Sequence, residues 1–410
     1  MEEQKAFLTL LIAFVNERDA ALPDGLNWED LYHLAAAQSL LGVLYDMARK
    51  LPPSIQPYAS VMQKLEWDYR YTVIRAIQQD YAVSEAEKAL DKAKIEYIPY
   101  KGYIVRRDYP VPELRTMGDM DMLVREEDQP RIQNVLTGMG YMFKGDFDDV
   151  WVYKQQNICF EIHNKLRYLR DEHSNLVELA GVWENVENIE NNEYKKVFTD
   201  EFQLVLLIAH MVKHFFIAGC GIRLALDVVL FFKKHPDMDW DKVIRWLRAN
   251  QLEQAFYFMA GYSEQVFGIV VDLPDKKEYS DEQYEKLSCE FLKSNTFGAY
   301  DSKLMKNYRA YQRNHKTKTN VKTAKKITRK QFIITFLFMP ADKMKLSRPY
   351  LNKYPWLLPF AHISRLVCGV FKKDVRKMTK NYVGFVRNIP DEAIEQAERK
   401  AEVHDLLGID

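Results

Sequence analysis

The stretch Gly118–Val124 constrains the fold of this 410-residue chain more than any other part of it. It reads Gly-Asp-Met-Asp-Met-Leu-Val, so two carboxylates lie one residue apart in an apolar run. In a β-strand, residues i and i+2 point to the same face. We therefore expect Asp119 and Asp121 to project together, while Met120 and Met122 turn into the core.

A second strand is expected at Ile158–Asn164, where Glu161 and His163 share a face. Two neighbouring carboxylates and a third on another strand supply the oxygen ligands that a pair of Mg²⁺ ions requires. We therefore expect Asp119, Asp121 and Glu161 to bind Mg²⁺, with the role of general base open to Glu161 as well. For His163, binding of phosphate or acceptor and a hydrogen-bonded structural role are both open.

The string PYKGYIVRRDYPVPELRTMGDMDMLV, which ends at Val124, and the later FEIH, which ends at His163, resemble an uncharacterised nucleotidyltransferase family. That family is part of the polymerase-beta-like nucleotidyltransferase superfamily, and the resemblance is strong across residues 95–170. It implies a Mg²⁺-dependent transfer of a nucleoside monophosphate from an NTP, with ATP expected, to an acceptor. The acceptor itself is not implied.

The resemblance also points to a phosphate-binding turn at Lys101-Gly102-Tyr103. The superfamily has Gly-Ser here: the glycine lets backbone N–H groups approach the triphosphate, and the serine hydroxyl binds it. This chain keeps Gly102 but has Tyr103 in place of the serine. We expect Lys101 and Arg115 to bind phosphate instead, together with the Gly102 backbone. An ion pair between Arg115 and one of the two strand aspartates is the alternative.

Two histidines, His210 and His214, lie four residues apart on a predicted helix and therefore share a face. The spacing is that of a zinc pair, but the glutamate of a metalloprotease motif is absent. We favour packing and hydrogen bonding beside the active site. A weaker resemblance that includes Lys213, Arg223 and Asp227 leaves contact with the nucleotide or acceptor open.

Changes in hydrophobic period predict an α+β fold. A small mixed sheet, with helices on one side, forms the nucleotidyltransferase core and is flanked by N-terminal and C-terminal helical regions. The expected regions are an N-terminal helical region (1–94), the α/β core (95–170), a helical domain (171–273) and a basic helical C-terminal region (274–410). Beyond the two strands above, strands are expected at 95–100, 141–144 and 150–154, short helices at 103–109 and 126–138, and helical structure again from Asn175.

Residues 302–373 contain eighteen Lys or Arg and one acid, Asp342. The whole chain has no net charge, so the remainder has a net charge of about −17. Three interpretations are open: binding to a nucleic-acid backbone, contact with an anionic membrane surface, and a solvated face that pairs with the acidic remainder. No specific nucleic-acid motif is present, so nothing favours the first.

Four cysteines are widely spaced and show no Cys-x-x-Cys pattern, which predicts free thiols in a reducing cytoplasm. The N-terminus lacks the basic start of a signal peptide, and no apolar run is long enough to cross a membrane. We expect a cytoplasmic protein, with attachment to a membrane surface as an open alternative.

Three functions therefore compete. The preferred one is a Mg²⁺-dependent nucleotidyltransferase acting on a hydroxyl of an unidentified acceptor. The second is a non-catalytic nucleotide- or anion-binding protein that uses the basic C-terminal region. The third is a metal-dependent phosphohydrolase that uses the same carboxylates with water as acceptor.

Overall fold

The computed structural model describes residues 2–146, 150–169, 176–179, 181–217, 219–294, 350–371 and 391–408, and singly 326, 330, 341, 344, 345 and 348. Contacts divide the chain into one unit of Met1–Ala299 with Val403–Asp410 and a second of Tyr300–Glu402. Most of the basic segment 302–373 lies outside the described residues, so what the sequence suggests for it stays a prediction. The four expected regions also stay a prediction.

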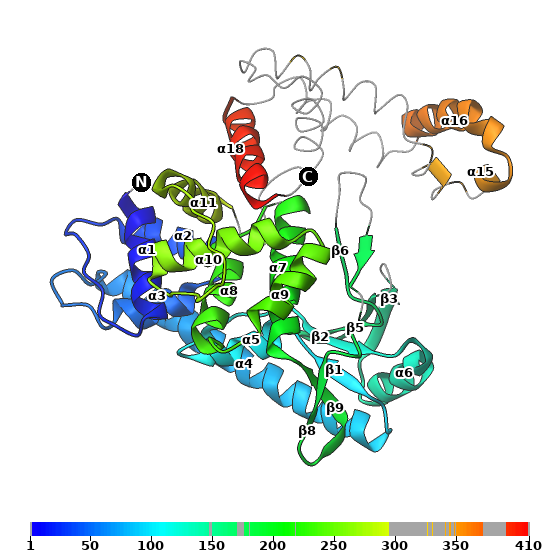
Figure 1. Ribbon diagram of the computed structural model, residues 1–410, viewed down its shortest axis with the longest axis horizontal. Coiled ribbons are helices and arrows are strands. Elements are labelled where there is room, and N and C mark those ends of the chain that lie inside the picture. Colours follow the sequence, from blue (N-terminus) through cyan, green and yellow to red (C-terminus); the bar gives the residue numbers. More distant parts are fainter. Residues whose placement is uncertain are drawn as a thin grey trace. The chain divides into compact units, whose positions relative to one another are not determined.

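The first unit begins with four helices, as the sequence predicts (Figure 1). They are α1 (Glu2–Val15), α2 (Trp28–Ala37), α3 (Leu41–Ala48) and α4 (Ala59–Lys92). The Asn27 side chain accepts hydrogen bonds from the first backbone N–H groups of α2, which stabilises the start of that helix. Pro52 and Pro53 separate α3 from α4, because proline cannot continue a helix interior.

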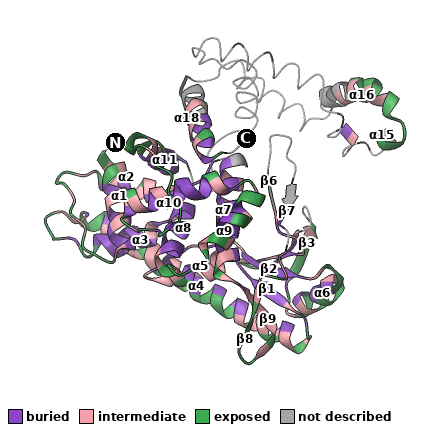
Figure 2. Ribbon diagram, viewed as in Figure 1, coloured by how far each residue is buried: buried purple, intermediate pink, exposed green. Residues whose placement is uncertain are grey.

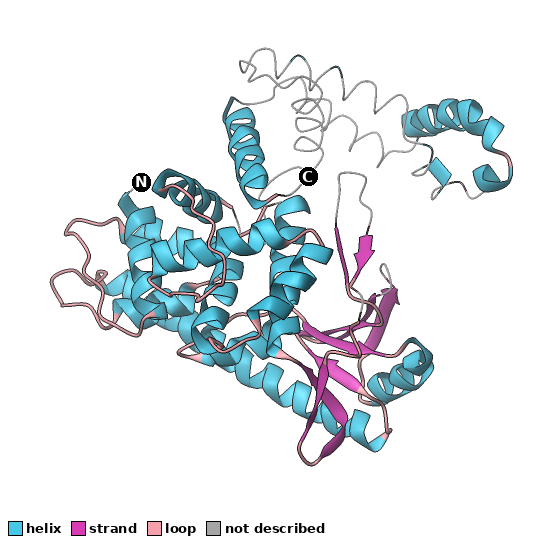
Figure 3. Cartoon of the chain, in the orientation of Figure 1, coloured by secondary structure: helices cyan, strands magenta, loops and turns pink. Residues whose placement is uncertain are grey.

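A seven-stranded mixed sheet follows, in the order β3-β4-β5-β2-β1-β9-β8 (Figure 3). Its strands are β1 (Tyr97–Pro99), β2 (Met120–Val124), β3 (Met142–Asp146), β4 (Val150–Gln155), β5 (Ile158–His163), β8 (Val186–Ile189) and β9 (Asn192–Phe198). β2 is parallel to β5 and β1 is parallel to β9, while the other neighbours are antiparallel. Between the strands lie α5 (Gly102–Val105), η1 (Arg106–Asp108), η2 (Pro112–Leu114), η3 (Glu126–Asp128) and α6 (Gln129–Gly138). The expected α+β class is therefore confirmed.

The sequence-based boundary at Asn175 is wrong. Where helix is expected, the chain forms β7 (Leu176–Glu178), which pairs with β6 (Arg167–Leu169), and then the hairpin of β8 and β9. Strand β9 joins the main sheet beside β1. Both strands of the hairpin are polar and mostly half-buried, and they owe their stability to partners across the sheet, so their own sequence shows only a weak strand pattern.

The sheet is covered by helices on both faces, whereas the sequence predicts them on one. Met120, Met122 and Phe160 pack against α4 and α6 in one apolar cluster, which confirms the inward direction of the two methionines. Ile98 and Leu123 belong to the opposite face and to the larger core of the helical layer. Because α4 lies far before β2 in the sequence, its place on the sheet is a long-range contact that local periodicity does not reveal.

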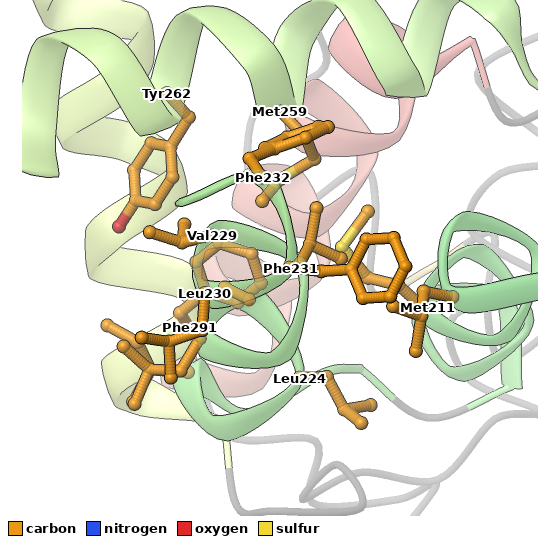
Figure 4. Packing of buried hydrophobic residues seen from close by; sticks show 14 of the residues in the cluster. Met211, Leu224, Val229, Leu230, Phe231, Phe232, Met259, Tyr262 and Phe291 are labelled. Carbon is orange, nitrogen blue, oxygen red and sulfur yellow. The ribbon is translucent and has the colours of Figure 1, made fainter. Parts of the chain in front are cut away.

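The helical layer consists of α7 (Asp200–Ile217), α8 (Ile222–Lys234), α9 (Trp240–Ala249), α10 (Glu253–Phe267) and α11 (Asp281–Lys293), joined by the end of α18 (Asp391–Leu407). Helix α8 is its centre, since every residue from Ile222 to Phe232 is buried (Figure 2). Figure 4 shows Phe231 and Phe232 among Met211, Met259 and other apolar side chains. A helix that is buried all round is held by contacts on every side, so α8 gives the site a rigid support.

In the second unit, α15 (Tyr350–Lys353), η4 (Pro355–Leu357) and α16 (Leu358–Phe371) are described, with a small cluster of Met344, Leu351 and Ala361. Among the described cysteines, Cys159, Cys220 and Cys289 are free thiols. None of the helices in the described part of the chain combines the length and the apolar character needed to cross a membrane.

Candidate active site

The predicted acidic residues meet where β2 and β5 run parallel. Asp121 is the direct neighbour of Glu161, and Leu123 is the neighbour of His163. Because side chains alternate along a strand, Glu161 and His163 lie on the same face of the sheet as Asp121, opposite the Met120 side. The structure therefore brings the acids of the two strands together on the face toward the helical layer.

Ligand atoms of Asp121, Glu161 and His163 all lie within 4.8 Å of one another. The Nε2 atom of His163 is 2.8 Å from Oδ1 of Asp121 and 3.8 Å from Oε2 of Glu161. Asp119, just before β2, lies outside this group but interacts electrostatically with both acids. We call Asp119, Asp121 and Glu161 the carboxylate cluster. For His163, the hydrogen bond to Asp121 agrees with the hydrogen-bonded role that the sequence left open, and binding of phosphate or acceptor stays a prediction.

Crowding of like charges changes the acidity of the carboxylate cluster. Burial raises the pKa of Glu161 to about 7, and the charges of Asp119 and Asp121 add to the effect. Burial also raises the pKa of Asp119, as does the neighbouring Asp121. For Asp121 the effect of burial is outweighed by Lys101 and His163, so its pKa lies below the usual range. Glu161 is thus the cluster member that changes charge near neutral pH.

Lys101 neutralises part of this charge. Its Nζ atom lies 2.6 Å from Oδ1 of Asp121, and the Asp121 charge raises the pKa of Lys101 although burial opposes this. Lys101 has φ of 54° and ψ of −130° at the start of α5. A backbone conformation of this kind costs a non-glycine residue roughly 1–3 kcal/mol. The strained turn aims an ammonium group at the acids, and phosphate binding by Lys101 stays a prediction.

Arg115 has a partner that the sequence does not suggest. Its guanidinium donates two hydrogen bonds to Asp227 of α8, from Nη2 at 2.6 Å and from Nε at 3.2 Å. The Tyr109 hydroxyl donates to the same carboxylate at 2.8 Å, and all three residues are buried. The expected alternative partners, Asp119 and Asp121, are not the residues that bind it. Phosphate binding by Arg115 stays a prediction that this geometry does not favour.

Gly102 is held in place by the same guanidinium. A Cβ atom at this position would lie 2.1 Å from Nη1 of Arg115 and 2.8 Å from its Cζ. Only glycine leaves room for such a close approach. Through Arg115, helix α8 therefore fixes the turn that carries Lys101, a role for Gly102 beyond the expected backbone contact with phosphate.

Helices α7 and α8 supply basic side chains near the carboxylate cluster. The rings of His210 and His214 contact each other edge to face, with centroids 4.5 Å apart. Burial, together with the charges of Lys213 and Lys101, lowers the pKa of His214 to about 4. Burial and Arg115 together lower the pKa of Arg223 to about 10. Acids from the sheet and bases from the helices thus flank one region, an arrangement suited to a metal-bound anionic substrate.

Sequence reasoning missed two residues of the site. The Tyr100 ring contacts the ring of His163 edge to face, and its buried hydroxyl has no hydrogen-bond partner among the described residues. Burial and the nearby acids raise the pKa of this hydroxyl far above its usual value. Gln79 of α4 donates a hydrogen bond of 3.1 Å to the carbonyl oxygen of Met117, just before Asp119. In the sequence, one feature of Tyr100 points to a role in the site: its position next to Lys101 at the end of an expected strand.

The donor set fits a divalent cation. Two carboxylates suit a hard cation, and the imidazole of His163 is a common ligand of transition-metal ions. The excess of negative charge and the raised pKa of Glu161 also favour a bound cation.

Among comparisons with known proteins, the one with family models identifies a family. A family model described as an uncharacterised nucleotidyltransferase matches residues 24–268, which is more than half of the chain. Among solved structures, the chain is similar to the antibiotic-resistance factor ANT(2″)-Ia, at 10% sequence identity and a TM-score of 0.33. The match covers 43% of this chain and 92% of that one. Similarity at that level carries no argument. No curated protein matches the sequence.

Proposed function

Since the chain belongs to the uncharacterised nucleotidyltransferase family, we propose that it transfers a nucleoside monophosphate, AMP from ATP, to an acceptor hydroxyl with Mg²⁺. One observation carries the proposal: Asp121, Glu161 and His163 converge within 4.8 Å on one face of two parallel strands, beside Asp119. Two chain segments separated by about forty residues supply these groups, and structural stability alone does not call for such a concentration of acids.

The carboxylate cluster is the part of the chain that would bind Mg²⁺ through its oxygen atoms, and the hydrogen bond from His163 would orient Asp121. When bound, Mg²⁺ would neutralise charge on the triphosphate and on the departing pyrophosphate. Lys101 adds a positive charge beside Asp121, and the Gly102 backbone lies next to it for contact with phosphate. We assign Arg115 no phosphate contact, because Asp227 and the carbonyl oxygen of Thr116 accept its hydrogen bonds.

Glu161 serves as general base in this proposal. Its carboxylate lies on β5 directly beside Asp121 of β2, where it could accept the proton of a hydroxyl that reaches the cluster. The acceptor hydroxyl oxygen forms a bond to the α-phosphorus, and the bond from that phosphorus to the pyrophosphate oxygen breaks. The hydroxyl proton passes to Glu161, and the electron pair of the broken bond leaves with pyrophosphate.

Calorimetry with Mg·ATP tests the nucleotide site. We expect binding to the natural protein and none to Asp119→Ala with Asp121→Ala. The matched control is Glu126→Ala with Glu127→Ala, which removes two exposed acids from η3 and keeps binding. Equal binding by all three proteins contradicts the proposal.

Transfer itself is tested with ATP labelled at the α-phosphate. Incubation with fractions of cell extract is expected to move the label onto an acceptor and to release pyrophosphate only when an acceptor fraction is present. Release of labelled AMP at the same rate without any acceptor would instead identify a phosphohydrolase and exclude transfer as the main reaction.

A further inference from the structure

Helix α4 exposes a row of large apolar side chains. Trp67 is 74% exposed, Tyr71 55%, Ile74 55%, Ile77 57% and Tyr81 68%. At 3.6 residues per turn these positions fall on one side of the helix, opposite the side that packs on the sheet. We call these five residues the α4 stripe. Contiguous apolar surface of this kind on a folded protein marks an interaction site.

The spacing of the α4 stripe is symmetric about Ile74. One apolar residue lies three positions away on each side, Tyr71 and Ile77, and one aromatic residue lies seven positions away on each side, Trp67 and Tyr81. A second copy of α4 running antiparallel would place Ile74 against Ile74, and each other residue against its symmetric mate. A two-fold interface requires this self-complementary pattern, in which i meets j and j meets i.

The charges beside the stripe have the polarity that an antiparallel pair needs. Lys64 and Arg70 flank its N-terminal half, with side chains 50% and 69% exposed. Asp80 and Glu85 flank its C-terminal half, with side chains 49% and 39% exposed. Glu66 and Lys88 carry the opposite sign, with side chains 41% and 70% exposed, which leaves these six residues with a net charge of one unit on each half, positive on the N-terminal and negative on the C-terminal half. All six residues have an ion-pair partner in their own chain, and antiparallel packing would bring the net positive half of one helix beside the net negative half of the other.

The exposed area is also of the right size. A fully exposed aromatic side chain contributes about 150–250 Å², so the stripe presents on the order of 600 Å² per copy. Specific interfaces bury about 800 Å² per partner, and residues next to the stripe would supply the rest.

We propose that this protein forms a two-fold symmetric dimer in which the α4 stripes of two copies pack antiparallel about Ile74. The inference stands independently of the reaction. It rests on exposure, spacing and charge along a single helix, and neither the carboxylate cluster nor the family match enters into it.

The first test measures the mass of the full chain by light scattering and sedimentation over a wide range of concentration. We expect a mass of twice 48.4 kDa, which falls toward a single copy on dilution. Ile74→Asp places two like charges at the symmetry axis and should weaken dimerisation about 100-fold or more, which corresponds to about 2.8 kcal/mol. Val270→Asp changes an apolar residue that is 63% exposed elsewhere and should leave the dimer intact.

The second test determines the direction of the pairing through engineered disulfides. Ile74→Cys should link two copies on oxidation, and so should Trp67→Cys combined with Tyr81→Cys, whereas Tyr81→Cys alone should not. The natural protein under the same oxidant gives the background from its own cysteines. A chain that stays single at high concentration overturns the proposal, as does a dimer unaffected by Ile74→Asp. Efficient linking by Tyr81→Cys alone indicates parallel pairing and overturns it as well.

Discussion

The carboxylate cluster and the Arg115–Asp227 pair both lie within the fold, but their charges are balanced differently. The pair is complete: two hydrogen bonds join opposite charges, and Tyr109 adds a third. In the carboxylate cluster, three acids share one nearby ammonium group, from Lys101, and burial raises the pKa of two of them.

The difference separates a group that serves the fold from a group that serves a ligand. A buried ion pair with all its hydrogen bonds gains nothing further from a ligand. A crowded set of acids is a cost to the folded chain that a bound cation relieves. Substitutions in the carboxylate cluster should therefore lower activity more than stability. Substitutions in the Arg115–Asp227 pair should lower stability more than activity.

The largest expected effect is on activity. Asp119→Asn should lower the rate of transfer at least 1000-fold, about 4 kcal/mol in the barrier, because a cation ligand is lost. The same change should leave the free energy of unfolding unchanged or slightly raised, since it removes one of the crowded charges. Initial rates and urea unfolding measure the two quantities. A rate within tenfold of the natural protein contradicts the assignment.

Asp227→Asn should lower the free energy of unfolding more than it lowers the rate of transfer. It leaves the buried Arg115 guanidinium without its carboxylate, which typically costs about 3–4 kcal/mol of unfolding free energy. Replacing both partners, as Arg115→Met with Asp227→Leu, should cost less than the single change. Urea unfolding compares the variants. A double variant that is less stable than Asp227→Asn contradicts this prediction, because the ion pair would then stabilise the fold by more than the cost of leaving Arg115 without its carboxylate.

Glu161→Gln should stabilise the protein at high pH when no metal is bound. The folded pKa of about 7 lies above the ordinary 4.5, so the unfolded chain binds fewer protons and stability falls as pH rises from 4.5 to 7. The variant lacks this loss and should be more stable by about 2–3 kcal/mol at pH 8, and equal near pH 4. Urea unfolding in a chelator checks it at both pH values. Mg²⁺ added at pH 8 should stabilise the natural protein more than the variant.

The smallest effect is expected at the turn that contains Lys101 and Gly102. Gly102→Ala forces the Arg115 guanidinium to move, at a cost of about 1–2 kcal/mol. A double-mutant cycle with Arg115→Ala isolates this contact. In that background the cost of Gly102→Ala should fall by at least half. A cost that does not depend on Arg115 would place the strain elsewhere in the turn.

The sequence predicts the acidic face of the site because a strand has a period of two. Glu161 and His163 are two positions apart in β5, and Asp121 lies between Met120 and Met122 in β2, which take the opposite face, as expected. The roles proposed for the acids and for Mg²⁺ stay predictions until a ligand is measured.

Long-range partners are what the sequence does not predict. Asp227 is 112 residues from Arg115, and nothing in the spacing of either residue points to the other. For the same reason, the sequence does not predict that α4 packs on the sheet or that β9 lies beside β1. Each depends on tertiary packing, which overrides local preference.

The matching register of β2 and β5 limits how this site can change. A shift of one residue along β5 would exchange Glu161 and His163 for Phe160 and Ile162 on the acidic face. Insertions or deletions inside either strand therefore invert the chemistry of that face. Variation in loop length is compatible with the proposed reaction, and variation in strand phase is not.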